Sequence, residues 1–152
     1  MFFLNHSKDT PLLQELIREG VFNSGFWESL QLPAEGHLMD VLLANYLRVA
    51  EKPWLDWLIR KHACTRIPSM EPTAAFIKAV DRKILSDCIR TDCYPLQVGD
   101  NHIFIGLGRP DYPDQLEALS GFYKKSTLYR NALSLAEIQR LRSLCHQALQ
   151  TI

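Results

Sequence analysis

The residues most like a chemical motif are the two glycines of HIFIGLGRP, at residues 102–110. A dinucleotide-binding loop has the pattern Gly-x-Gly-x-x-Gly at the turn from a strand into a helix. Here Asp111 stands where the third glycine would be, and Pro110 has no backbone N–H to donate to a phosphate. Glycines within a strand more often mark a bulge or a close approach of the backbone. Gly106 and Gly108 are therefore predicted to be structural.

No other combination of residues predicts catalysis or a metal site. The nearest match to a phosphate-binding P-loop, Gly121 with Lys124 and Lys125, lacks the second glycine and precedes a predicted strand. The histidines are not spaced for joint coordination, and the cysteines form no C-x-x-C pair and have no histidine at zinc spacing. We therefore expect no enzymatic activity, no metal and no resident cofactor. An enzyme whose site is assembled from distant residues stays open as an alternative.

Composition and charge limit the partners. The 17 basic residues balance the 17 acidic residues, so no net field attracts nucleic acid or anionic lipid. With 47% hydrophobic residues the chain can build a core, but no stretch approaches the ~20 apolar residues of a membrane span. The opening MFFLNHSKDT lacks the long apolar run of a secretory signal. We expect a compact cytoplasmic protein with reduced thiols.

The first part of the chain has helical periodicity throughout. One helix is predicted to start at Pro11, with Thr10 as its cap, and to end at Gly20. The others are a short helix capped by Asn23 or Ser24, a helix from His37 to about Val49, and a helix that starts at Pro53. The last of these carries Trp54 and Trp57, which are expected to be core plus rim, with one of them exposed if the pair binds a protein partner.

The second part mixes helices and strands. The order is a helix through AAFIKAVDRKILSDCI, a β-hairpin of CYPLQV and HIFIGLG around GDN, and a short helix in DQLEALSGFY. A strand within KKSTLYRNAL and a final helix follow, and that helix opens with a capping box of Ser134 and Glu137. The fold class predicted is α+β. A helical N-terminal subdomain (residues 1–66) packs on a small α-β-β-α-β-α subdomain (residues 67–152), as one compact unit.

Two segments of the helical part repeat one pattern, LLQELIREG at 12–20 and HLMDVLLANY at 37–46. Leu12, Leu16, Ile17 and Gly20 correspond to Leu38, Leu42, Leu43 and Tyr46. The pair resembles the tandem R-L-G-x-x-L-V-x-x-G motifs in the N-terminal domains of type II secretion and type IV pilus assembly ATPases. The later run of Arg66-Ile67-Pro68, Tyr94-Pro95-Leu96, IFIGLG and Arg109-Pro110-Asp111 is similar to that family's "IP … PL … L-x-V-A … DP".

The resemblance implies a domain without a motor that docks an ATPase onto membrane-associated partners. One subgroup of the family binds cyclic di-GMP through the two motifs, and similar domains are attached to glycosyltransferases that respond to this nucleotide. Here Pro11 and His37 replace the motif arginines, while Leu13 and Met39 replace the first glycines. What remains is an apolar set that we name the leucine ledge: Leu12, Leu16, Ile17, Leu38, Leu42 and Leu43. The ledge could pack against guanine or could simply be core.

The function expected is a non-catalytic docking or regulatory domain of a bacterial secretion, pilus or envelope-polysaccharide system. Its partner would be a protein, such as a membrane-associated secretion or glycosyltransferase component, which could hold it at the inner membrane. The alternative is a cyclic di-GMP sensor whose candidate ligand residues are the leucine ledge with Gly20 and His37. A secretion chaperone fits the size of the chain but not its neutral charge.

Overall fold

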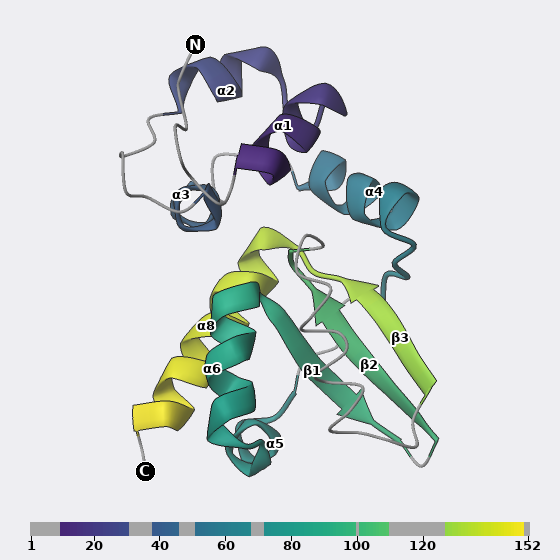
Figure 1. Cartoon of the computed structure of the whole chain (residues 1–152), viewed down its shortest axis with the longest axis vertical. Coiled ribbons are helices and arrows are strands. Elements are labelled where there is room, and N and C mark those ends of the chain that lie inside the picture. The colour runs from purple at the N-terminus through teal and green to yellow at the C-terminus, as the bar shows by residue number, and fades with distance from the viewer. Residues whose placement is uncertain are drawn as a thin grey trace.

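The computed structural model describes residues 10–30, 38–45, 51–67, 72–99, 101–109 and 127–150 and confirms an α+β fold. One group of elements, the helical unit, consists of α1 (Thr10–Arg18), α2 (Ser24–Ser29), α3 (Leu38–Ala44) and α4 (Lys52–Lys61). The other, the sheet unit, consists of α5 (Ala74–Ala79), α6 (Arg82–Thr91), β1 (Cys93–Val98), β2 (His102–Leu107), β3 (Thr127–Ala132) and α8 (Leu135–Gln150). The helical unit lies at the end of the sheet unit where α8 begins (Figure 1).

The helix ends follow the expected capping residues. Gly20 has φ +69°, and two backbone bonds close the end of α1 as a Schellman motif, from Val21 N to Leu16 O (3.0 Å) and from Gly20 N to Ile17 O (3.1 Å). Asn23 caps α2, because its Oδ1 accepts from Phe26 N at 2.8 Å. Both predictions are confirmed. The third helix begins at Leu38, and its predicted part beyond residue 45 lies outside the described residues.

The single helix predicted from residue 74 onward is wrong, because the structure has two helices there. Val80 is extended, with ψ 144°, and ends α5. The side chain of Asp81 then accepts from Lys83 N at 2.8 Å and caps α6. The aspartate side chain can bond a nearby backbone N–H and so start a new helix in place of a continuous one. The apolar periodicity continues across both helices, so it gives no sign of the break.

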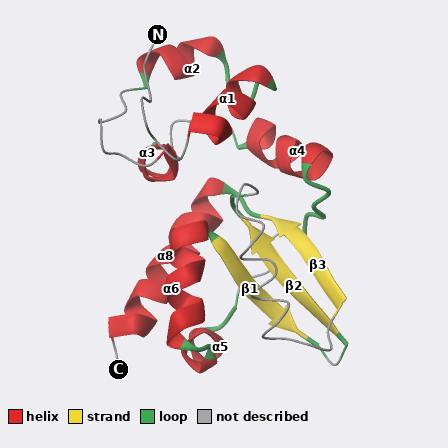
Figure 2. Cartoon of the chain, in the orientation of Figure 1, coloured by secondary structure: helices red, strands yellow, loops and turns green. Residues whose placement is uncertain are grey.

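The sheet has the order β1-β2-β3. Antiparallel pairing of β1 with β2 confirms the predicted hairpin, with an irregularity between Pro95 and Gln97. The predicted third strand is β3, and it pairs with β2 in parallel, with Phe104 opposite Tyr129. Figure 2 shows the strands in yellow, with α6 and α8 packed together beside β1. The helix predicted between β2 and β3 lies outside the described residues.

A short segment after α4 continues the sheet beyond β3. Thr65 pairs in parallel with Asn131, because Thr65 N donates to Arg130 O and Ala132 N donates to Thr65 O, both at 2.8 Å. The Asn131 amide then holds the backbone of Ile67 through Oδ1 (2.7 Å) and Nδ2 (3.3 Å). The boundary predicted between residues 66 and 67 therefore falls within a segment that is bonded to the sheet.

Both glycines of HIFIGLG lie where the chain is tightly packed. A Cβ added to Gly106 would lie 2.8 Å from the methyl carbons of Leu133, and one added to Gly108 would lie 2.7 Å from the carbonyl oxygen of Asp92. Gly108 N donates to that same oxygen at 2.8 Å. The prediction that these glycines serve a close approach is confirmed.

Candidate functional site

The ligand residues predicted from the tandem motifs belong mostly to the core. Five members of the leucine ledge are at most 3% exposed: Leu12, Leu16, Leu38, Leu42 and Leu43. Ile17 is 46% exposed, Gly20 is also exposed, and His37 lies outside the described residues. This burial corrects the idea that a guanine base packs on the ledge, because the leucines pack in the shared hydrophobic core and offer no surface.

The tryptophan pair is also internal. Trp54 and Trp57 are both 0% exposed, and their ring centroids lie 5.3 Å apart. Trp54 Nε1 donates to Leu133 O at 2.8 Å, across 79 residues of sequence. The expectation of a partner surface on these two residues is corrected accordingly: helix α4 turns them toward the rest of the protein, and Trp54 joins the two units.

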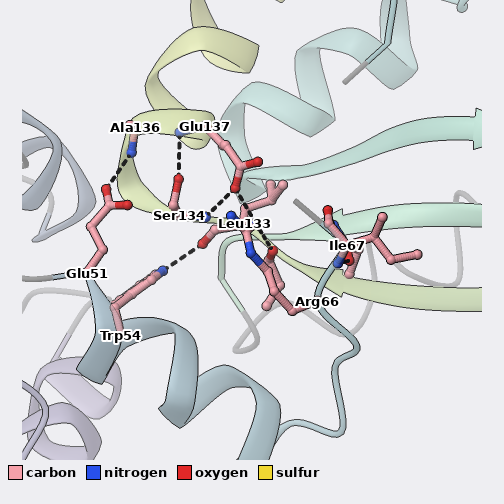
Figure 3. Close-up of polar contacts among 10 residues, drawn as sticks. Glu51, Trp54, Arg66, Ile67, Leu133, Ser134, Ala136 and Glu137 are labelled. Atoms are coloured by element: carbon pink, nitrogen blue, oxygen red, sulfur yellow. Dashed lines mark hydrogen bonds and ion pairs between the residues drawn. The ribbon is translucent and has the colours of Figure 1, made fainter. Parts of the chain in front are cut away.

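The turn from β3 into α8 is the main joint between the units, and we call it the junction (Figure 3). Ser134 and Glu137 form the predicted capping box, with Ser134 N donating to Glu137 Oε1 (2.8 Å) and Glu137 N to Ser134 Oγ (3.1 Å). Glu51, which precedes α4, accepts from Ala136 N at 2.9 Å. Its carboxylate thus lies at the positive end of the α8 dipole and links the helical unit to it. Arg66 donates to Glu137 and to Ala132 O.

A second link between the units runs through Arg142 on α8. Its guanidinium donates to both carboxylate oxygens of Asp92, from Nε at 3.2 Å and from Nη2 at 2.6 Å, and it also donates to Asp40 of α3. The hydroxyl of Tyr94 donates to Asp92 at 2.8 Å. Asp92 is 1% exposed and adopts a left-handed backbone conformation with φ 51°.

Burial and the ion pair together set the pKa values of this cluster. It raises the pKa of the Asp92 carboxyl above its usual value, although Arg142 and Tyr94 act to lower it. Burial and the neighbouring Asp92 hold the pKa of Tyr94 well above its usual value. For Arg142, burial opposes the charge, but the carboxylates of Asp92 and Asp40 raise its pKa overall. Because Asp92 and Tyr94 are shut away from solvent and their partner Arg142 reaches α3, we interpret the cluster as a structural link between the units.

Nothing among the described residues is arranged as a nucleophile with its base. No group of three or more His, Cys, Asp or Glu side chains in those ranges could hold a metal ion. His62 Nε2 and Glu15 Oε2 lie 3.3 Å apart, and the Cys64 thiol donates to the backbone oxygen of His62 at 3.6 Å. Burial raises the pKa of Cys64 to about 11, so this thiol is not activated.

A cleft of about 310 Å³ lies where the end of α1 meets the start of α4. It is lined by Glu19, Gly20, Val21, Lys52, Pro53, Asp56 and Arg60. A Cβ added to Gly20 would contact nothing within 4 Å, so this glycine borders open space. Ion pairs cross the surface here, from Lys52 to Asp56 (2.7 Å) and from Lys61 to Glu19 (2.9 Å). Gly20, a predicted ligand residue, thus lines a cleft.

The sheet carries an aromatic group that we name the surface aromatic cluster: His102, Phe104 and Tyr129. The rings of Phe104 and Tyr129 stack with centroids 5.3 Å apart, and His102 meets them edge-on at 5.5 and 6.3 Å. Tyr129 is 44% exposed, His102 is exposed and Phe104 is half-buried. The sequence did not indicate this group, because only the parallel pairing of β2 with β3 brings residue 129 beside residue 104.

No protein-family model and no curated protein matches this chain. Within the ranges that the structure describes, every helix is too short or too polar to cross a membrane.

The leucine ledge gives a stability prediction. Replacing Leu42, which is 0% exposed, by Asp places a charge in the core and should cost more than about 4 kcal/mol, enough to unfold the protein. The matched control is Ile17→Asp, because Ile17 is the exposed member of the ledge. That change should cost within about 1 kcal/mol. Circular dichroism in buffer shows whether each variant folds, and urea unfolding measures the free energy of unfolding of any variant that does. Equal losses would show that the two leucine-ledge positions do not differ in packing.

The Arg142 link gives a pH-dependent prediction. Arg142→Met removes the cation that bonds both oxygens of the buried Asp92 carboxylate, leaving Arg109 as the nearby positive charge, and should cost about 3 kcal/mol at pH 7. Asp40→Asn removes only the exposed partner and should cost less than about 1 kcal/mol.

Asp92 already has a raised pKa in the folded protein, and loss of Arg142 raises it further. Between the pKa of Asp92 in the unfolded chain and its higher pKa in the folded variant, the folded variant binds a proton that the unfolded chain has released. The free energy of unfolding of the variant therefore falls as the pH rises through this range. The deficit relative to the parent should shrink as the pH is lowered from 7 towards 4 in denaturant titrations. A deficit that is constant with pH would mean that Asp92 is not the group left unpaired.

Proposed function

We propose that the chain is a non-catalytic docking or regulatory domain of a bacterial secretion, pilus or envelope-polysaccharide system. The observation that carries the proposal is the surface aromatic cluster. Aromatic side chains are enriched in protein interfaces, because they offer a large contact area with few rotatable bonds. This cluster begins at the start of β2, at the end of the sheet that points away from the helical unit (Figure 1).

Two further features support contact with a protein. The charged side chains at the junction and around Arg142 form bonds within the protein and stabilise its fold. A partner would therefore bind through other surface residues. The balance of 17 basic and 17 acidic residues favours a protein partner over nucleic acid. The kind of system rests on the tandem motifs and on the run from Arg66 to Asp111. The partner is then a membrane-associated component that the domain meets in the cytoplasm, at the inner membrane.

The test uses the tagged full chain, cross-linked in bacteria and purified with its partner for identification by mass spectrometry. Tyr129→Ala should weaken binding at least about tenfold, since it removes an exposed aromatic anchor. Ile17→Ala is the matched control, because Ile17 is 46% exposed against 44% for Tyr129, and it should bind as the parent does. A partner from outside these systems, or one that binds Tyr129→Ala unchanged, would refute the proposal.

The second candidate, a cyclic di-GMP sensor, is favoured by the cleft at Gly20. Its volume of about 310 Å³ is at the lower end of the range for small-molecule sites. Lys52 and Arg60 on its wall are cations that could bind phosphate. In this version the ligand sits beside the closing glycine of the first motif and not on the leucines.

Isothermal titration of the protein with cyclic di-GMP, with cyclic di-AMP and GTP as controls, tests the second candidate. Saturable binding at micromolar affinity, selective for cyclic di-GMP and weakened at least about tenfold in a Lys52→Ala, Arg60→Ala double variant, would establish a sensor. Ligand at one hundred times its dissociation constant would also stabilise the fold by about 2.7 kcal/mol. Absence of heat and of any thermal shift would leave only the docking proposal.

A further inference from the structure

Among the described residues, the outer edge of β3 is paired along only half of its length. Successive residues of a strand point their backbone N–H and C=O groups to opposite sides. Thr127 N donates to Asn101 O and Leu133 N to Leu107 O, so the odd-numbered residues of β3 face β2. The even-numbered residues face outward, and Arg130 O and Ala132 N are taken by Thr65.

Three outward groups remain at the start of β3: the N–H and C=O of Leu128 and the N–H of Arg130. Among the described residues nothing pairs with them, since Thr65 is the first residue of its segment to reach the strand. Ala63, with φ 52°, turns the preceding chain away toward α4. Thr127, Tyr129 and Arg130 are exposed and Leu128 is half-buried, so this half of the edge is open to solvent. An open edge is a template for another strand.

The chain itself shows what the edge accepts. Its own segment pairs with the other half through a parallel bridge at Thr65, with two backbone bonds of 2.8 Å and a side-chain contact from Asn131 to Ile67 N. A strand laid along the free half would lie in line with that segment and would continue the same ladder. Ile67, 40% exposed, lies at the far end of that segment.

Side chains on the two faces of the edge add specificity. Tyr129 lies on one face, within the surface aromatic cluster, and suits an apolar residue of the incoming strand. Arg130 lies on the other face, is exposed and forms no ion pair with the described residues, so it suits an acidic residue. Alternating side chains of a bound strand reach opposite faces.

We propose that the free half of the β3 edge, next to Tyr129 and Arg130, binds an extended segment of the protein partner as an added strand. The segment alternates an apolar residue, placed on Tyr129, with an acidic residue, placed on Arg130. The inference rests on the proposed docking function and names its site and the form of its ligand.

The probe is a synthetic peptide chosen from random phage-displayed peptides that bind the folded full chain. Amide hydrogen exchange at Leu128 and Arg130 should slow at least about tenfold in the complex, because these N–H groups become bonded. The amides of Thr127 and Tyr129 should not change, since they already face β2. Protection confined to other elements, such as the helical unit, would overturn the proposal while leaving a docking function in place.

Two variants at one position separate the backbone from the charge. Arg130→Pro removes the outward N–H, which an edge strand tolerates, whereas Arg130→Ala keeps the N–H and loses only the cation. The proline variant should bind the probe at least about tenfold more weakly than the alanine variant. Equal affinities would overturn the added strand.

A third arm does not depend on how the proline variant folds. Only every second backbone N–H of a bound strand faces β3, so two probes are methylated, one on each alternating set of backbone nitrogens. Methylation of the set that faces β3 should abolish binding, and methylation of the other set should leave binding intact. Failure of this alternation, or the absence of any peptide selected on the parent over Arg130→Pro, also overturns the proposal. The Tyr129→Ala experiment with the native partner then decides the docking function separately.

Discussion

The free N–H groups in the first turn of α8 are the constraint around which the two units are assembled. A helix start leaves these donors without partners in its own backbone, and here side chains from separate segments satisfy them. Ser134 caps the helix locally, whereas Glu51 reaches Ala136 from the start of α4. Trp54, one turn further along α4, bonds the carbonyl oxygen that precedes the cap. The start of α8 thus fixes the position of the helical unit. The capping box holds the turn into α8 in the conformation to which Glu51 and Trp54 bond.

The Arg142 cluster orients the units rather than driving them together. Its carboxylate at Asp92 is almost wholly buried, so the attraction of Arg142 first has to offset the loss of hydration. Such clusters contribute little net stability, yet they penalise any packing that leaves the charge unpaired. Because the same guanidinium reaches Asp40 on α3, a shift of the helical unit would break that contact. Hydrophobic burial supplies the stability, and the polar contacts select the arrangement.

Local signals in the sequence predicted the features that depend on a few neighbouring residues. Gly20, Asn23 and the box of Ser134 with Glu137 lie where expected, because a cap is decided within one helical turn. The parallel register of β3 was not predictable, since it joins strands whose neighbourhood depends on the whole crossover. Five of the predicted ligand leucines and both tryptophans prove to be buried for a related reason. Periodic leucines and paired tryptophans look the same on a binding face and on a core face, and only the packing of α1, α3 and α4 identifies these as core.

The contact of Trp54 with Leu133 spans 79 residues, and the pairing of Thr65 with Arg130 spans 65. A ribosome adds roughly 5–20 residues each second, so a nascent helical unit waits on the order of ten seconds for the residues that complete it. During this interval the indole N–H of Trp54 has no carbonyl partner and the segment at Thr65 has no strand to pair with. The helical unit therefore lacks the partners of Trp54 and Thr65 while the second half of its own chain is still being made.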